Sequence, residues 1–334
     1  MPSRHGSVWR TRVTGGKTIE VGYKLSSEEH HPRDLVRYAA RAESIGMRFA
    51  LISDHYHPWT NRQGQSPFVW ATLGGISQAT SSLRVGTGVT CPTIRTHPAI
   101  VAQAAATVAE MMPNRFFLGV GTGENLNEHV LGDKWPAVQT RLEMLEEAVQ
   151  VMRELWTGKQ VSFEGDHYVV ENARLYTCPD DPVDVMVAAS GEKAAAVAGK
   201  IGDGVVSVAP QEEVLRTFDE TGGAGKPRYA EVQVCWARDE AEARSIAHEW
   251  WPNVAIKGQL SQELPLPAHF DQAAKMVTEE DVAQSVSCGP DPEVHLEGLK
   301  KFAEAGFDHL AVHQIGPDQG GFFDFYDKQV LPRL

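Results

Sequence analysis

The sequence lacks any long apolar run. No stretch reaches the roughly 20 apolar residues that a membrane-spanning helix needs, so we expect no membrane partner. Residues 1–16 contain Arg4, Arg10 and Arg12 but not the apolar segment that a secretion signal requires. We therefore expect these residues to form a disordered or packed N-terminal extension of a cytoplasmic protein.

Cysteine is also scarce, with 4 among 334 residues. Cys91, Cys178, Cys235 and Cys288 are scattered and lack the close spacing of a zinc site. Isolated thiols are typical of a reduced, cytoplasmic protein, in which a buried cysteine acts as a small packing residue. The histidines have no matching cluster of Cys, Asp or Glu, so we expect no metal site.

Positive charge is in short supply too. The chain has 31 Lys and Arg residues against 44 Asp and Glu residues, which gives a net charge of −13. Nucleic acid binding needs a basic surface, so we expect a small-molecule substrate and no nucleic acid partner. The charge balance still allows one basic pocket for a small anion. A hydrophobic content of 42% and a charged content of 22% are typical of a globular protein.

Short apolar segments alternate with helical patterns along almost the whole chain. The predicted strands are Ile19–Lys24, Phe49–Ile52, Leu83–Val89, Phe116–Val120, Asp184–Ala188, Gly204–Val208, Glu231–Trp236 and His309–Ile315. Repeated strand–helix units form parallel sheets, and about eight of them favour a closed (β/α)8 TIM barrel over an open doubly wound sheet. We therefore predict an α/β protein with a single domain over residues 1–334.

Two segments depart from this alternation. Residues 161–169 have the pattern of a hairpin that turns at Gly165-Asp166. Residues 252–287 are irregular at first and then helical, and we interpret them as an insertion into the barrel. No linker composition or internal repeat indicates a second domain.

The fourth predicted strand ends in a run of glycines. Phe116–Val120 is followed by Gly121, Thr122, Gly123 and Glu124. Glycines let a ligand approach the backbone closely, and ligands of parallel α/β proteins bind at the C-terminal ends of the strands. A flexible turn is an equally good interpretation of the glycines alone, because a Gly-x-Gly-x-Gly string is weak evidence for a nucleotide.

The second predicted strand is followed by Asp54, His55 and Trp59. His55 can titrate near neutral pH, and Asp54 can orient it. Glu124 offers a second group for proton transfer at the same end of the barrel. Trp59 provides a flat face against which a ring or a sugar can pack.

Several short motifs lie at these strand ends. They are Gly22-Tyr23-Lys24, Ser53-Asp54-His55 with Pro58-Trp59, Gly86-Thr87-Gly88-Val89 with Pro92-Thr93, Pro113-Asn114-Arg115, and Gly119–Glu124 with Leu126-Asn127-Glu128. Together they resemble the luciferase-like flavin and deazaflavin oxidoreductases, and most of all the coenzyme F420-dependent glucose-6-phosphate dehydrogenase group. The resemblance covers essentially the whole chain beyond the N-terminal extension. It implies a homodimer with coenzyme F420 as cofactor, and FMN is the alternative cofactor.

The resemblance also implies where the cofactor binds. Asp54 would contact the deazaflavin, and Gly88-Val89 would form a non-prolyl cis peptide, a bulge that lies against the ring. Asn127 would form a hydrogen bond nearby. The other residues assigned to the cofactor are Cys91, which stands where the family pocket has a threonine, and Thr122, Gly123, Ser190 and Gly191, which would bind the phosphate and the tail.

Three residues would carry the reaction. His55 would accept the hydroxyl proton of the substrate, Glu124 would supply or accept a proton at the ring, and Trp59 would pack over the reacting centre. These roles imply an oxidoreductase that moves hydride between F420 and a small organic molecule. The molecule is an alcohol or carbonyl compound, or a nitroaromatic hydride acceptor.

The sequence differs from this group at the positions where members bind a sugar phosphate. Members clamp the phosphate with cations, but the loop Ser207–Gln211 has none, and the position of a family arginine falls near Gln284-Ser285. A phosphate dianion without several cationic partners is disfavoured, so we expect a substrate other than glucose 6-phosphate. The residues assigned to the substrate are Lys24, Trp59, Lys257 and His313.

The residues leave further interpretations open for the function and for two of these side chains. The chain is also compatible with a sugar-6-phosphate dehydrogenase that uses Lys257, Lys275 or Lys24 as its cations. It is compatible as well with an FMN-dependent luciferase-like monooxygenase and with a non-catalytic F420-binding protein. Lys24 is equally interpretable as a solvated lysine, and His313 as a satisfied core histidine.

Overall fold

Parallel strands close into a barrel in the computed structural model, which describes residues 11–13, 17–256 and 258–334. In order around the barrel, the strands are β2 (Lys17–Leu25), β3 (Phe49–Ile52), β4 (Arg84–Thr87), β5 (Phe116–Val120), β8 (Val185–Ala188), β9 (Gly204–Ser207), β10 (Arg228–Cys235) and β12 (His309–Gln314). All neighbours are parallel, and β12 pairs with β2, which closes the sheet. The predicted (β/α)8 barrel is confirmed.

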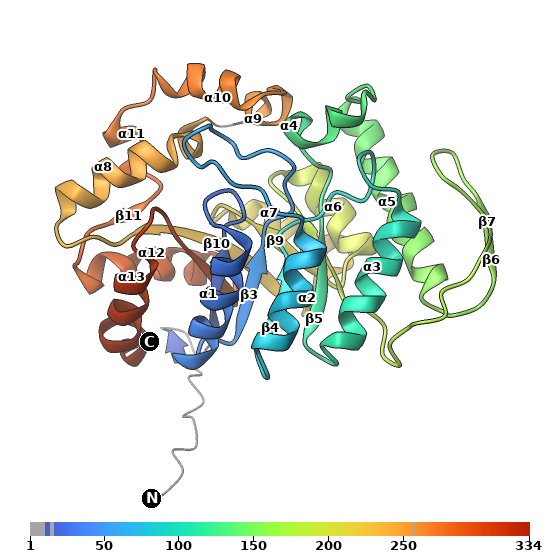
Figure 1. The fold of residues 1–334 in the computed structure, drawn as a ribbon, viewed down its shortest axis with the longest axis horizontal. Coiled ribbons are helices and arrows are strands. Elements are labelled where there is room, and N and C mark those ends of the chain that lie inside the picture. The colour runs from blue at the N-terminus through green and yellow to red at the C-terminus, as the bar shows by residue number, and fades with distance from the viewer. Residues whose placement is uncertain (1–10, 14–16, 257) are drawn as a thin grey trace, which may run out of the picture.

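Helices connect the strands and cover the outside of the barrel (Figure 1). The main ones are α1 (Pro32–Ser44), α2 (Val69–Ala79), α3 (Pro98–Met111), α5 (Val138–Leu155), α6 (Glu192–Ile201), α7 (Glu212–Phe218), α8 (Glu240–Trp250), α12 (Pro292–Ala305) and α13 (Gln319–Phe325). Prolines begin α1, α3 and α12. Proline has no backbone N–H, and this costs nothing at a first helical position, where an N–H would have no acceptor within the helix. The side chains of His31, His97 and Asp291 cap these helices. Gly306 ends α12 in the left-handed conformation, with a φ of 109°.

Shorter helices complete the connections. They are α4 (Asn125–Glu128), α9 (Gln259–Glu263), α10 (Pro267–Ala274) and α11 (Glu279–Ala283), the 3-10 helices η1 (His129–Leu131), η3 (Pro252–Ala255) and η5 (Leu331–Arg333), and the π-helical turns η2 (Asp219–Gly223) and η4 (Tyr326–Val330). Figure 1 shows α9, α10 and α11 along one end of the molecule, in the segment predicted as an insertion. This segment lies over the C-terminal end of β3, because the Asn61 N–H donates to Asp271 (3.2 Å) and the Gln63 side chain donates to Asn253 (3.1 Å).

The sequence missed some strands and misjudged the ends of several others. β1 (Thr11–Val13) pairs antiparallel with β2, within the predicted extension, of which residues 1–10 and 14–16 lie outside the described residues. β11 (Ser287–Cys288) pairs with β10. The strand predicted to reach Val89 ends at Thr87, because the chain leaves the strand ladder at Gly88 and rejoins β5 only through Thr90. The predicted hairpin is present as β6 (Val161–Glu164) and β7 (Val169–Ala173), and it stands to one side of the barrel (Figure 1).

The part of the barrel interior that lies away from the C-terminal ends of the strands is filled by buried side chains. This inner cluster consists of Phe49, Leu51, Phe117, Met186, Val206, Tyr229 and Ala311, with Val89 packed against it. Gly22 and Gly86 make room for two of the rings, because a Cβ at Gly22 would lie 2.7 Å from the Phe49 ring and a Cβ at Gly86 would lie 2.1 Å from the Phe117 ring. The cluster fills the barrel toward the N-terminal ends of the strands. A ligand is therefore expected to enter at the C-terminal ends of the strands, as in other barrels of this type.

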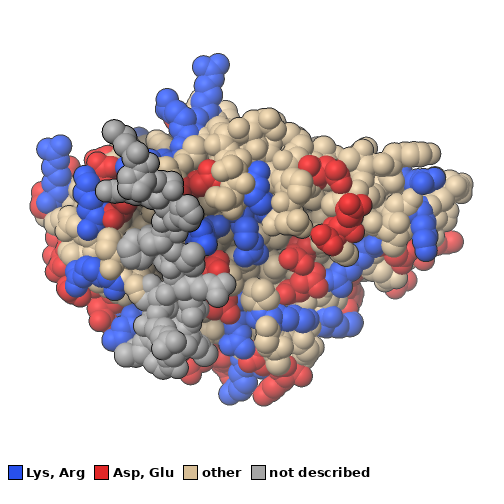
Figure 2. Space-filling view, turned by 90° about the horizontal axis from the view of Figure 1, so that it is seen from below, with Lys and Arg blue, Asp and Glu red and all other residues tan. Residues whose placement is uncertain are grey.

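Figure 2 shows Lys and Arg side chains interspersed with Asp and Glu side chains on one face, so the described residues form no continuous basic surface there. Among the described residues, every helix is too short or too polar to cross a bilayer.

We predict that Gly22→Ala destabilises the fold by about 3 kcal/mol, the upper end of the usual effect of overpacking. The new Cβ would lie 2.5 Å from the Phe49 carbonyl oxygen, which belongs to a neighbouring strand and cannot move alone. Urea unfolding measures the change. Gly74→Ala in α2 is the matched control, because its Cβ meets only Met111 at 3.9 Å, and it should leave stability unchanged or raise it slightly. Equal stabilities for the two variants would contradict this account of the barrel interior.

Candidate active site

His55 lies between a carboxylate and an aromatic ring at the end of β3. Its Nε2 atom is 3.5 Å from Oε1 of Glu28, and its Nδ1 atom is 3.2 Å from the His57 carbonyl. An Nδ1–H that donates to this carbonyl leaves Nε2 free to accept a proton. The adjacent Glu28 carboxylate then stabilises the imidazolium, so His55 is equipped to act as a base.

Glu28 is a site residue that the sequence interpretation missed. It is buried and accepts hydrogen bonds from Ser26 (3.1 Å) and Ser53 (2.6 Å). Burial alone would raise the pKa of Glu28, but His55, Lys24 and the Ser53 hydroxyl together lower it, so the carboxylate is ionised near neutral pH. The signal was present in the sequence, since Glu28 follows the C-terminal end of the first strand just as Asp54 follows that of the second.

Trp59 forms a wall beside His55. The two ring centroids are 5.1 Å apart, and on its other side Trp59 meets Phe270 of α10 edge-on at 5.2 Å. The Trp59 backbone N–H donates to the Gln63 side chain (2.8 Å), which itself binds the inserted segment. The inserted segment therefore holds an aromatic, apolar wall against the proposed base.

Asp54 belongs to a buried ion cluster. It accepts hydrogen bonds from Thr90 (2.8 Å) and from Arg95 (3.1 Å), and Glu128 accepts one from the Arg95 backbone N–H (2.9 Å). Burial raises the pKa of Glu128 to about 7, although the Arg95 charge opposes this shift. Arg95 and Glu128 were not predicted as site residues, and no spacing in the sequence indicates that they meet Asp54.

Asn127 links Glu124 to the loop that carries His55. Its side-chain oxygen accepts hydrogen bonds from the backbone N–H groups of Tyr56 (2.8 Å) and His57 (3.1 Å), and its amide donates to Glu124 at 3.4 Å. Asn127 is buried, whereas Glu124 is only half-buried. The amide thus fixes the position of Glu124 relative to His55 and leaves the carboxylate open on one side.

The glycines after β5 are required by packing. The predicted cis peptide is present between Gly88 and Val89. A Cβ at Gly121 would lie 2.8 Å from a Val89 methyl group, and a Cβ at Gly123, where φ is +74°, would lie 2.6 Å from the Cys91 sulfur. Burial raises the pKa of the Cys91 thiol, so it is neutral and acts as a packing group. The glycine run therefore lets Val89 and Cys91 lie directly on β5.

Ser190 and Gly191 lie where β8 leads into α6. Gly191 is the N-cap of this helix, and a Cβ there would have no neighbour within 4 Å among the described residues. Ser190 is exposed. The start of α6 thus presents open backbone N–H groups, which suits an anionic group. The assignment of Thr122, Gly123, Ser190 and Gly191 to the cofactor stays a prediction.

The residues assigned to the substrate have different surroundings. The Lys24 ammonium donates to the Gly88 carbonyl (2.7 Å) and pairs with Glu231 (2.8 Å). His313 is fully buried and its Nε2 atom is 2.7 Å from Glu29. Lys257 lies outside the described residues. Trp59 is therefore the member of this set that the structure brings next to His55, and the role of all four in binding the substrate stays a prediction.

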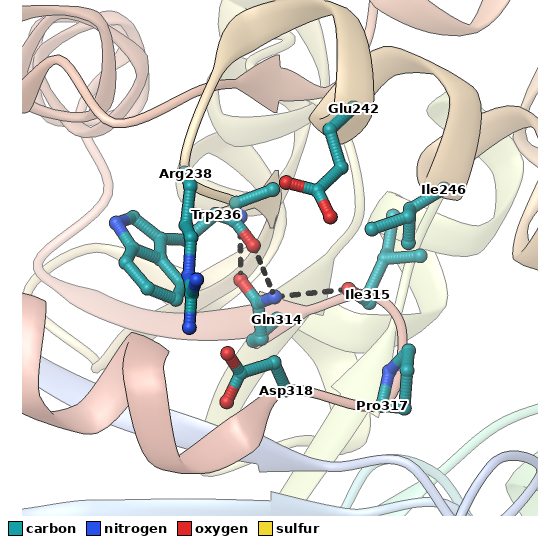
Figure 3. A pocket seen from close by; sticks show the side chains of 9 residues that line it. Trp236, Arg238, Glu242, Ile246, Gln314, Ile315, Pro317 and Asp318 are labelled. Carbon is teal, nitrogen blue, oxygen red and sulfur yellow. Dashed lines mark hydrogen bonds between the residues drawn. The ribbon is translucent and has the colours of Figure 1, made fainter.

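A cavity of about 210 Å³ lies outside this site, between α8 and the segment that follows β12 (Figure 3). Its lining includes Trp236, Glu242, Gln314 and Asp318, and none of the predicted site residues. The Gln314 side chain accepts from the Trp236 N–H (2.8 Å) and donates to the Trp236 and Ile315 carbonyls (3.2 and 3.0 Å). Its polar atoms are satisfied by the backbone, so we assign this cavity no function.

The fold and the strand-end residues together define a class of protein. The sequence profile of the luciferase-like monooxygenases matches residues 16–309, and the chain belongs to this family. Within the family it belongs to the group of F420-dependent oxidoreductases. A protein of Kribbella flavida named F420-dependent glucose-6-phosphate dehydrogenase is 37% identical over 330 residues, which is 95% of this chain and 98% of the relative. A protein of the same name from Segniliparus rotundus is 35% identical over 329 residues, again 95% of this chain and 98% of the relative.

Solved structures give the same grouping. An F420-dependent secondary alcohol dehydrogenase in complex with an F420–acetone adduct is 31% identical and superposes with a TM-score of 0.88 over 93% of this chain and 98% of that chain. The coenzyme F420-dependent tetrahydromethanopterin reductase of Methanopyrus kandleri, at 20% identity and a TM-score of 0.77, covers 94% of this chain and 99% of its own and shares the fold.

We predict that Glu128→Gln flattens the dependence of stability on pH. The folded state raises the pKa of Glu128 from 4.5 to about 7, so its stabilising contribution is complete below pH 4.5 and is lost as the pH rises through 7. The loss amounts to about 3.5 kcal/mol at most, since one pKa unit corresponds to about 1.4 kcal/mol. Urea unfolding at pH 5 and pH 8 should show this loss in the native chain and a smaller one in the variant. Glu143→Gln on the exposed face of α5 is the control, and identical pH profiles for all three proteins would disprove the burial argument.

Proposed function

We propose that this protein is an alcohol dehydrogenase that passes hydride from a small, uncharged alcohol to coenzyme F420. The observation that carries the proposal is the position of His55, with Glu28 at 3.5 Å on one side and the Trp59 ring at 5.1 Å on the other. A base supported by a carboxylate and bordered by an apolar wall suits the removal of a hydroxyl proton from an organic substrate. The reverse reaction, reduction of a carbonyl compound or a nitroaromatic acceptor, uses the same groups.

Coenzyme F420 is the cofactor of this chain. The residues present fit its parts, since Val89 lies raised on the glycines of β5, and the backbone at Gly191 is open for an anionic group. Asp54, Gly88, Val89, Cys91 and Asn127 would lie about the ring, and Thr122, Gly123, Ser190 and Gly191 would bind the phosphate and the tail. F420, when bound, supplies a ring carbon that accepts or returns a hydride.

His55, Glu28 and Trp59 would prepare the alcohol for this transfer. Nε2 of His55 would accept the hydroxyl proton, and the Glu28 carboxylate would stabilise the resulting imidazolium. Trp59, held by Gln63 and Phe270, would exclude water from the reacting carbon. Glu124, positioned by Asn127, would hold a proton on the side of the ring opposite to His55.

The charges of the described residues support an uncharged substrate. Two cations at the barrel mouth, Lys24 and Arg95, are paired with carboxylates, at 2.8 and 3.1 Å. The loop Ser207–Gln211, where members of the group bind a phosphate, contains no cation. This loop therefore offers a phosphate dianion no cationic partner of its own.

A sugar-6-phosphate dehydrogenase is the second candidate, because the relatives at 35% and 37% identity carry that name. Lys257 would then supply a cation. The related secondary alcohol dehydrogenase, at 31% identity, supports the first candidate. A chain that retained FMN and consumed oxygen would instead be a monooxygenase, and one that bound F420 without turnover of any substrate would be a binding protein.

We predict a strong preference for a simple alcohol over a sugar phosphate. With F420 and 2-propanol, the decrease in the visible absorbance of the oxidised cofactor should give a kcat/KM at least about 100-fold higher than with glucose 6-phosphate, since a buried phosphate without cations forfeits several kcal/mol. Glucose serves as the uncharged control for sugar binding. Faster turnover of glucose 6-phosphate would decide for the second candidate.

We predict that His55→Ala lowers kcat by about 10²- to 10⁴-fold, the usual contribution of a general base. F420 binding, followed by its fluorescence, should stay nearly unchanged, because the imidazole acts on the substrate. His31→Asn is the control, since this exposed histidine caps α1 and the asparagine can also cap it. Full activity of His55→Ala would rule out His55 as the base.

A further inference from the structure

A chain of four buried charges crosses the barrel just below the proposed site. Lys24 pairs with Glu231 (2.8 Å), Glu231 lies 3.4 Å from Nδ1 of His313, and Nε2 of His313 lies 2.7 Å from Glu29. Glu29 also accepts a hydrogen bond from the Gly316 N–H (2.9 Å). The two cations and two carboxylates alternate, so the buried charges compensate one another.

Strand geometry places this chain of charges inside the barrel. Side chains two residues apart on a strand share a face. Tyr229 and Ala311 belong to the inner cluster of the barrel, so Glu231 on β10 and His313 on β12 point to the same interior, one layer closer to the site. The four charged residues therefore form the layer between the apolar cluster and the proposed F420 site.

Lys24 connects this layer to the segment that carries Val89. Its ammonium donates a hydrogen bond of 2.7 Å to the carbonyl of Gly88, the residue directly before Val89. The Lys24 side chain is only 6% exposed, so this contact is sheltered from water. The ammonium thus spans from β2 to the end of β4 and fixes one side of the Gly88–Val89 segment.

The other side of Val89 is fixed by packing. Its two methyl groups lie where a Cβ at Gly119 or Gly121 would come within 3.1 and 2.8 Å, and the side chain packs on the inner cluster. Val89 is half-buried, so it also faces the mouth of the barrel. The position of Val89 at the mouth of the barrel therefore depends on two contacts. One is its packing on the β5 glycines, and the other is the hydrogen bond from Lys24 to the neighbouring Gly88 carbonyl.

The partners of Lys24 hold it in place. Burial alone would lower the pKa of His313, but the Glu231 and Glu29 carboxylates raise it to about 9. Burial alone would also raise the pKa of Glu231, but Lys24 and His313 hold it well below its usual range. Both groups are ionised at neutral pH, so Glu231 is held by two cations and holds Lys24 in turn.

We propose that Lys24 is a positioning residue for hydride transfer, which holds the Gly88 carbonyl and thereby sets the height of Val89 beneath the F420 ring. Glu231, His313 and Glu29 support it and do not contact the substrate. The proposal rests on F420 as cofactor but not on which substrate donates the hydride. It assigns Lys24 and His313 a role other than the binding of a substrate anion.

The test compares Lys24→Met, which keeps the length of the side chain and removes its charge and its hydrogen bonds, with Lys226→Met. Lys226 is the matched control, because it also donates to backbone carbonyls, those of Gly199 (3.2 Å) and Gly202 (2.7 Å), but on the connection between α6 and β9. Titration with oxidised F420 gives the dissociation constant and the visible absorption band of the bound cofactor. Saturation kinetics with the best alcohol give kcat and KM separately.

We expect Lys24→Met to shift the absorption band of bound F420 and to lower kcat on the order of 100-fold, as a small misplacement of reacting atoms does. The dissociation constant of F420 and the KM of the alcohol should change less than about 3-fold, because the substitution affects the chemical step and not ground-state binding. Lys226→Met should leave the band and kcat unchanged. A raised KM with unchanged kcat would overturn the proposal in favour of direct substrate binding, and an unshifted band with full kcat would overturn it outright.

Glu231→Gln keeps the proposal testable if Lys24→Met does not fold. This variant retains a hydrogen-bonding partner for Lys24 but removes the charge that holds it. We expect the same band shift and a smaller decrease in kcat, and an unchanged band and kcat would contradict the supporting role of Glu231. Absence of turnover by the unmodified chain would refute the alcohol dehydrogenase and leave the absorbance test of Lys24 intact.

Discussion

The pairing of β12 with β2 is the constraint on which the site depends. It closes the parallel sheet and brings β2 and β12 side by side, so that Glu29 meets His313 across 284 residues of sequence. The neighbouring pairing of β2 with β3 likewise brings Glu28 beside His55. Hydrogen bonds between parallel strands thus decide where every polar group of the site can lie.

Closure also explains how the barrel tolerates so many ionised side chains near its centre. A buried charge is stable only when partners of opposite charge and hydrogen bonds replace its water. Two clusters satisfy this condition. One joins Lys24 to Glu231, and the other joins Arg95 to Asp54 and Glu128. In both clusters the cation is paired with carboxylates of the protein itself.

Much of the site was predictable in outline. The alternation of apolar strands and helices indicated the barrel, and parallel strands present their C-terminal ends together, which placed His55, Trp59 and Glu124 at one mouth. The structure adds a reason for the glycines after β5 that the sequence did not show, since they accommodate Val89 and Cys91. Arg95 and Glu128 were missed, because a loop has no periodicity that shows where its side chains point.

The sequence by itself determined the barrel and the kinds of side chain at its mouth, since local periodicity and strand order need no knowledge of distant contacts. Only the tertiary structure decided which of these groups pair. Glu28 and Glu29 are neighbours of identical type, yet one lies beside His55 and the other beside His313. The direction of each carboxylate depends on which strand end lies opposite, and the closed barrel alone sets that arrangement.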